Sequence, residues 1–176
     1  MTDDRPRRRK PAPDAPGTGE SSPARRWPTH AAGETAGADE TSPAEGWSRV
    51  TRDVRVSVRS FYLDDQSRPD DAHFVWAYRV RIENRGREPV QLLRRTWHIT
   101  DARGRTQYVH GEGVVGEQPV LEPGETFEYT SGTPLDTPSG FMRGAYHMLA
   151  PASGESFDVS IPIFSLDSPH QGGVVH

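Results

Sequence analysis

The run FVWAYRVRIEN, residues 74–84, decides the fold. Large apolar residues occupy every second position, and charged residues fill the gaps from position 79 onward: Phe74, Trp76, Tyr78, Val80 and Ile82 alternate with Arg79, Arg81 and Glu83. A β-strand places alternate residues on opposite faces, whereas a helix would scatter these five apolar residues around its circumference. The run therefore predicts a strand with one face in a core and one face in solvent.

Six further stretches between Asp53 and Phe164 are β-like, and sequences rich in Gly, Pro, Asp and Ser separate them. They are VRVSVRSFYL, VQLLRRTWHIT, TQYVHGEG, FEYTSG, FMRGAYHML and FDVSIPIF. Seven strands in about 112 residues, with turns every 8–15 residues and no helical period, predict an all-β fold. We expect an antiparallel sandwich of fibronectin type III or immunoglobulin-like architecture.

Two of these strands contain an irregularity. In residues 90–100, Leu93, Trp97 and Ile99 can share a face, but Arg95 lies between them, and a β-bulge or a barrel-like corner would resolve the conflict. In residues 157–164, Phe157, Val159, Ile161 and Ile163 alternate, and Pro162 lacks the N–H that a central strand needs. The last strand is therefore expected at the edge of its sheet.

The chain divides into three parts by composition. Residues 1–48 are rich in Pro, Gly, Ser and Ala, so they cannot bury enough apolar surface to fold and are expected to be a disordered tail. Residues 49–167 would form the sandwich, and residues 168–176 a flexible C-terminal end.

Composition also excludes several classes of protein. The absence of cysteine removes disulfides and thiolate metal sites. No apolar run approaches the roughly 20 residues of a membrane helix, and the basic N-terminus lacks the apolar core of a signal peptide. The net charge of −4 argues against nucleic-acid binding. We therefore expect a cytoplasmic protein with no membrane span and no nucleic-acid partner.

The segment HGEGVVGEQP is the candidate binding loop. Gly111, Gly113 and Gly116 match the pattern G-x-G-x-x-G, which binds pyrophosphate where a helix N-terminus follows. Pro119 and Pro123 follow here, so a bulge-rich structural loop, an anion-binding concavity and a protein-contact surface all stay open. The candidate ligand-binding residues are His110, Gly111, Glu112, Gly113 and Gly116.

Three histidines are candidate metal ligands. His110 and Glu112 are two apart in a strand and can point the same way, and His98 and His147 might join them across the sandwich. Imidazole suits cobalt, whereas magnesium prefers oxygen ligands. Scattered histidines are more often solvated or hydrogen-bonded than metal-bound, because a site needs convergent geometry.

Several of these motifs together resemble the bacterial ApaG proteins. The resemblance covers about Val54 to Leu166 and is strongest in FVWAYRVRIEN, PVQLLRRTWHITDARG and GEGVVGEQPVLEPGETFEYTSG. It implies a fibronectin type III-like sandwich and an association with cobalt tolerance and magnesium efflux. The family's genes often lie beside a diadenosine tetraphosphatase gene, and the same domain in eukaryotic proteins implies a protein-interaction module.

We therefore expect a non-enzymatic binding protein, an accessory factor in cobalt and magnesium homeostasis, with no cofactor and an unidentified protein partner. The sequence shows no nucleophile with a base in reach, so no hydrolase is expected. Two alternatives stay open: a pyrophosphate or dinucleotide sensor that uses the glycine loop, and a protein-interaction module without a small ligand.

Overall fold

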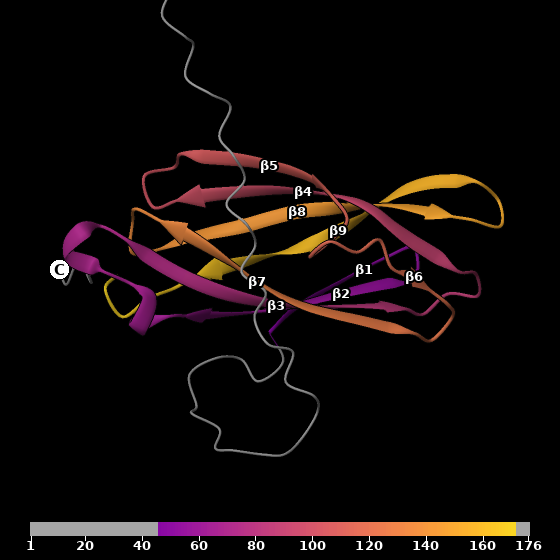
Figure 1. Cartoon of the computed structure of the whole chain (residues 1–176), viewed down its shortest axis with the longest axis horizontal. Helices are drawn as coiled ribbons and strands as arrows, with labels where there is room; N and C mark the ends of the chain where they lie inside the picture. Colours follow the sequence, from indigo (N-terminus) through magenta and orange to yellow (C-terminus); the bar gives the residue numbers. More distant parts are fainter. Residues whose placement is uncertain (1–45, 172–176) are drawn as a thin grey trace, which may run out of the picture.

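The computed structural model describes residues 46–171, which form two antiparallel β-sheets packed face to face (Figure 1). These residues contain no α-helix, only two 3-10 turns, η1 (Asp64–Gln66) and η2 (Pro69–Asp71). No described helix is long and apolar enough to cross a membrane. The predicted fold class, an antiparallel sandwich of fibronectin type III-like architecture, is confirmed.

The two sheets share the strands as follows. The first has the order β1-β2-β3-β7, with β1 (Trp47–Thr51), β2 (Val54–Tyr62), β3 (Phe74–Asn84) and β7 (Thr126–Leu135). The second has the order β5-β4-β8-β9, with β4 (Val90–Asp101), β5 (Thr106–Glu112), β8 (Gly140–Ala150) and β9 (Glu155–Leu166). The short β6 (Val120–Leu121) pairs with β4 beyond the end of β5.

Two of the nine strands in residues 46–171 were not predicted. β1 lacks periodicity because its residues are exposed or half-buried throughout, so it has no face that sequence can mark as apolar. β6 is only two residues long and lies between Pro119 and Pro123. β1 begins at Trp47, and the remainder of the predicted tail lies outside the described residues.

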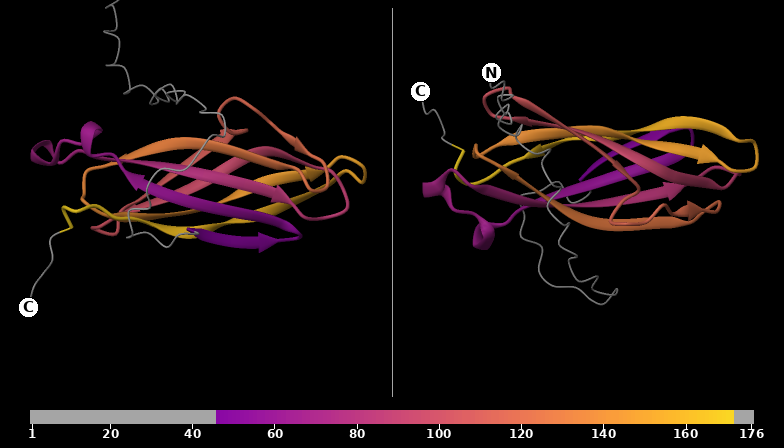
Figure 2. Two further views of the ribbon diagram at one scale, coloured as in Figure 1. Left: turned by 90° about the horizontal axis from the view of Figure 1, so that it is seen from below. Right: turned by 45° about the horizontal axis from the view of Figure 1, so that its top comes forward.

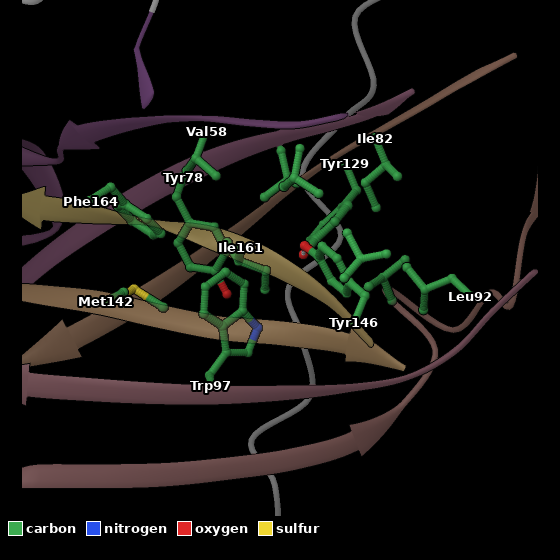
Figure 3. Packing of buried hydrophobic residues seen from close by; sticks show 14 of the residues in the cluster. Val58, Tyr78, Ile82, Leu92, Trp97, Tyr129, Met142, Tyr146, Ile161 and Phe164 are labelled. Carbon is green, nitrogen blue, oxygen red and sulfur yellow. Dashed lines mark hydrogen bonds between the residues drawn. The ribbon is translucent and has the colours of Figure 1, made fainter. Parts of the chain in front are cut away.

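The core fills the space between the sheets (Figure 3). All five apolar residues predicted on the inner face of β3 are buried. The rings of Tyr78, Trp97 and Phe164 pack together, with centroids 5.3–6.0 Å apart in tilted or edge-to-face contacts. Aromatic pairs in these geometries stabilise a core beyond the area that they bury.

A β-bulge in β4 and a register shift between β8 and β9 each change which residues face the core. The predicted bulge in β4 is present between Leu92 and Arg94, but it buries Leu92 rather than Leu93. A second shift sets Met142 opposite Phe164 and Gly144 opposite Ile161, so Phe164 points inward and Ile163 is exposed. The prediction that Ile163 continues the apolar face was wrong, since one extra residue reverses the phase. β9 is an edge strand, as Pro162 predicted.

The first and last strands close one side of the sandwich. Trp47 of β1 packs against Phe164 of β9, with ring centroids 6.0 Å apart, and the left view of Figure 2 shows β1 (indigo) beside β9 (yellow). Ser60 donates its hydroxyl proton to the carbonyl of Ser165 across the same side. His170 lies beside Tyr62 and Phe74, so at least part of the predicted C-terminal end packs on the domain. The other side is bounded by β5 and β7, each paired in its ladder with a single strand.

The turn from β4 to β5 is held by the carboxylate of Asp101. Its Oδ1 accepts hydrogen bonds from the amides of Arg103 and Arg105, and its Oδ2 accepts one from Nε of Arg105 at 2.9 Å. Burial alone raises the pKa of Asp101, but these hydrogen bonds and the guanidinium charge outweigh it and hold the pKa below its usual 3.8.

Asp101→Asn is expected to lower the stability of the fold at neutral pH. A carboxylate with a depressed folded-state pKa contributes stability above its unfolded pKa and loses that contribution as pH falls through the folded value. The melting temperatures of the two proteins should therefore differ most above about pH 5 and converge below pH 3.8. Thermal denaturation followed by circular dichroism across this range checks the prediction, and a constant difference at every pH would contradict it.

Candidate functional site

The glycine segment forms a tight hairpin at the end of β5. Val114 and Glu117 exchange two backbone hydrogen bonds of 2.8 and 2.9 Å, and Val115 and Gly116 lie between them with φ of 45° and 80°. Positive φ at both central residues is the geometry of a type I′ turn. Gly116 adopts it without steric cost, whereas Val115 is a β-branched residue in a region that such residues rarely occupy.

Close approaches of other groups account for the two remaining glycines. Gly113 has φ of 59°, and a Cβ there would lie 2.2 Å from the carbonyl oxygen of Glu117. A Cβ at Gly111 would lie 2.8 Å from the guanidinium of Arg95. Gly113 and Gly116 are therefore explained by backbone conformation, and Gly111 by the close approach of the Arg95 side chain.

Arg95 lies beneath the hairpin, on the same face of β4 as the buried Trp97 and Ile99. Its Nη1 donates to the carbonyls of Glu112 and Gly113, and its strand partner on β8 is the buried Tyr146. Tyr146 and Tyr129 share a hydrogen bond between their hydroxyls, and Figure 3 shows the two side chains pointing toward each other. Burial raises the pKa of both phenols, while the charge of Arg95 acts in the opposite direction.

The hairpin lacks the features of a pyrophosphate-binding fingerprint. The chain continues through Pro119 into β6, and no helix begins near Gly116. The amide of Gly113 donates to the carbonyl of Leu93, and those of Val114 and Glu117 are used within the turn. Three amides that could line an anion-binding concavity are thus already hydrogen-bonded inside the protein.

The candidate metal ligands lie on the outer face of one sheet rather than on opposite sides of the sandwich. Thr96 Oγ1 lies 3.2 Å from Nδ1 of His110 and 2.8 Å from Nε2 of His147, and therefore connects the two. His98 instead packs against Tyr108, with ring centroids 4.7 Å apart. Within residues 46–171, no three His, Asp or Glu side chains converge as metal ligands.

Asp158 extends this hydrogen-bonded row across four strands. Its Oδ1 lies 2.7 Å from Nδ1 of His147. Since a carboxylate only accepts, Nδ1 of His147 donates to it, Nε2 of the neutral ring accepts from the Thr96 hydroxyl, and Thr96 accepts from His110. We call Asp158, His147, Thr96 and His110 the histidine row.

Sequence patterns did not indicate this row, and no nucleophile with a base in reach was expected. Hydroxyl, imidazole and carboxylate stand here in the order of a nucleophile, its base and an orienting group. The three residues come from β4, β8 and β9, so no local motif marks them, and only the cross-strand register reveals them. They lie on an open sheet face, where Asp158 and the nearby Glu112 are exposed. Their described hydrogen-bond partners include no donor placed to stabilise an oxyanion.

The fold and the hairpin together define a small fibronectin type III-like β-sandwich domain. Residues 64–150 match the family model described as the ApaG domain. The chain is 66% identical over 125 residues to Protein ApaG of Paramagnetospirillum magneticum, covering 71% of this chain and 95% of that protein. It is 67% identical over 124 residues to Protein ApaG of Rhodospirillum centenum, covering 70% and 95%. A crystal structure titled as an ApaA protein from Bordetella pertussis has 52% identity and a TM-score of 0.65, covering 67% of this chain and 95% of that one. The chain belongs to the ApaG family.

Alanine substitution separates the roles of two glycines in the hairpin. Gly116→Ala meets open space and incurs only the left-handed backbone cost, about 1–2 kcal/mol. Gly113→Ala incurs the same cost and a clash with a backbone carbonyl, which adds roughly 1–3 kcal/mol. Urea denaturation of the two variants measures the difference, and equal destabilisation would show that the Glu117 carbonyl moves aside freely.

The histidine row predicts the tautomer of His147. When its ring is neutral, nitrogen NMR shifts should show the proton on Nδ1, because that atom donates to Asp158. Thr96→Val should leave this tautomer unchanged, whereas Asp158→Asn should shift the ring toward a mixture of tautomers. A predominant Nε2–H form in the unmodified protein would contradict the hydrogen-bond order given above.

Proposed function

We propose that this ApaG-family chain is a non-enzymatic binding protein that contacts a partner protein through the free edge of β5 and the adjoining hairpin. The observation that carries the proposal is the exposure of this edge. Among the strands of residues 46–171, β5 pairs with β4 alone, and this edge strand is mostly exposed. A strand edge with unpaired backbone groups is a template onto which a partner can add a strand.

Exposed apolar side chains accompany the free edge. Tyr108 on β5, Val115 in the hairpin and Val120 on β6 are each 45–62% exposed. Backbone groups supply affinity in strand addition, while apolar side chains beside the edge select the partner. The amides of Gly113, Val114 and Glu117 already donate hydrogen bonds within the protein, so they are not available to phosphate oxygens. This supports a protein ligand at the hairpin over a dinucleotide.

We further propose that this partner acts in cobalt and magnesium homeostasis in the cytoplasm, a role that the resemblance to ApaG proteins supports. An indirect role, exerted through a protein contact, agrees with the chemistry of the histidine row. The histidine row offers two imidazoles that already share a threonine hydroxyl. Magnesium instead prefers sites rich in carboxylate oxygens. The chain would thus act on cation transport by binding a component of the efflux machinery.

Substitution on the edge tests the protein contact. With the full chain as bait in crosslinking and affinity capture, Tyr108→Glu is expected to abolish retention of the specific partner, because it places a charge beside the docking edge. Phe61→Glu is the matched control, since Phe61 is similarly exposed but lies on β2 of the other sheet. Equal retention by both variants, with folding verified by circular dichroism, would refute β5 as the contact.

Titration of the isotope-labelled chain tests the two alternatives. We expect cobalt and magnesium to cause no localised NMR shifts at His98, His110 or His147. We likewise expect ADP and diadenosine tetraphosphate to leave Gly111 to Gly116 unshifted. Localised shifts at the histidines would support direct metal binding, and shifts confined to the glycine segment would support a nucleotide sensor.

A further inference from the structure

The outer face of the second sheet carries exposed apolar side chains near the end of β9. Phe141 of β8 and Ile163 of β9 are 41% and 56% exposed. Arg143 is also exposed and lies two residues after Phe141, on the same face of β8. We call Phe141, Arg143 and Ile163 the outer patch.

The register shift between β8 and β9 creates this patch. It falls between Met142 and Gly144 of β8 and inserts one extra residue into β9. Arg143 therefore lies opposite both Pro162 and Ile163, and the extra residue turns Ile163 out of the core. Because residues 46–171 leave Ile163 exposed, its side chain is available to a group from outside this part of the chain.

Arg143 adds a positive charge to the patch. Within residues 46–171 its guanidinium forms no ion pair and no side-chain hydrogen bond. Its cross-strand neighbour on β4 is His98 rather than a carboxylate. The outer patch therefore suits a ligand that combines an apolar side chain with acidic residues.

The chain enters the sandwich beside the outer patch. β1 runs antiparallel to β9, since Trp47 contacts Phe164 and the Thr51 hydroxyl accepts a hydrogen bond from the amide of Ser160. The described part of the chain thus begins next to the residue that follows Ile163 (Figure 2). Residues 1–45 precede this point and lie outside the described residues.

The sequence of residues 1–45 supplies a ligand of the required kind. It contains no Val, Ile, Leu, Phe or Tyr, and Trp27 is its single aromatic residue. The charged residues between Trp27 and Trp47 are all acidic, namely Glu34, Asp39, Glu40 and Glu45. Trp27 precedes Trp47 by 20 positions, and an unstructured connection of that length spans roughly 25 Å.

We propose that the outer patch binds Trp27 of the same chain, with the acidic connection passing close to Arg143. The indole ring would cover Phe141 and Ile163, and Pro28 favours an extended backbone at Trp27, which can lie flat on a sheet. Attachment to the sandwich gives the segment an effective concentration on the order of millimolar, so the segment of the same chain is favoured over that of a second copy.

This contact is separate from the proposed protein contact. The outer patch lies on β8 and β9, and β4 stands between these strands and β5. Loss of Trp27 docking in Ile163→Ser and loss of partner capture in Tyr108→Glu can therefore be observed independently.

Paramagnetic relaxation enhancement in NMR of the full chain tests the proposal. The chain has no cysteine, so Thr29→Cys provides a unique attachment point for a nitroxide close to Trp27. We expect the amide signals of the outer patch to lose intensity by about twofold or more, because the tethered segment stays close to them. A nitroxide on Thr2→Cys is the matched control, since it lies 25 positions from Trp27, and it should cause no selective loss there.

Substitutions on each side of the contact identify its anchors. In the nitroxide-labelled Thr29→Cys chain, Trp27→Ala and Ile163→Ser should each restore the signals of the outer patch. Phe61→Ser is the matched control for Ile163→Ser and should leave the loss unchanged, because Phe61 is a similarly exposed apolar residue of the first sheet. Trp27→Ala changes no residue of the sandwich, so it decides the outcome even if Ile163→Ser impairs folding.

Three results would overturn the proposal. They are a uniform loss of intensity across the sandwich, a loss centred away from the outer patch, and a loss that persists in Trp27→Ala. Mixing nitroxide-labelled chain with isotope-labelled chain that lacks the nitroxide should leave the signals of the outer patch unchanged. A selective loss in that mixture would assign the occupant to a second copy and would also overturn the contact within one chain.

Discussion

The structure depends on one constraint, that the two faces of β3 have opposite solvation requirements. Its inner residues are apolar and can leave water only if a second sheet covers them. β3 pairs with β2 on one side and β7 on the other, so its alternation sets the facing of both neighbours. The outward residues of the same strands are then fixed by register, and Arg55, Arg59, Arg79 and Arg81 come together on the outer face of β2 and β3.

The second sheet is shaped by two single-residue irregularities. The bulge in β4 lets Leu92 face the core together with Trp97 and Ile99, although Leu92 is an odd number of residues from both. Arg95 is in phase with Trp97, so its guanidinium reaches the carbonyls of Glu112 and Gly113 and fills the space that a Cβ at Gly111 would need. The irregularity opposite β8 exposes Ile163 in β9 instead of leaving it in the core.

Period-two patterns in the sequence were enough to predict the sandwich, the inner face of β3 and the existence of a bulge near Arg95. They could not predict β1, whose residues lie at an edge and bury no complete face. Nor could they predict which outward residues become neighbours, because register depends on strand pairing over long distances. Thr96, His147 and Asp158 come from three strands, and the arginines of β2 and β3 were recognisable only as two separate outward faces. Glycine spacing suggested a nucleotide loop, and hydrogen bonding within the turn explains the same glycines without one.

The packing of β1 against β9 has a consequence for how the chain acquires its structure. Trp47 and Phe164 are in contact although they lie at opposite ends of the folded region, and Ser60 bonds to Ser165 across 105 positions. Such pairings carry a large loop-closure entropy and slow the search for the native state. During synthesis on the ribosome the early strands β1 and β2 have no complete partner surface until β9 has emerged. The assembly of this domain can therefore be completed only after β9 has been synthesised.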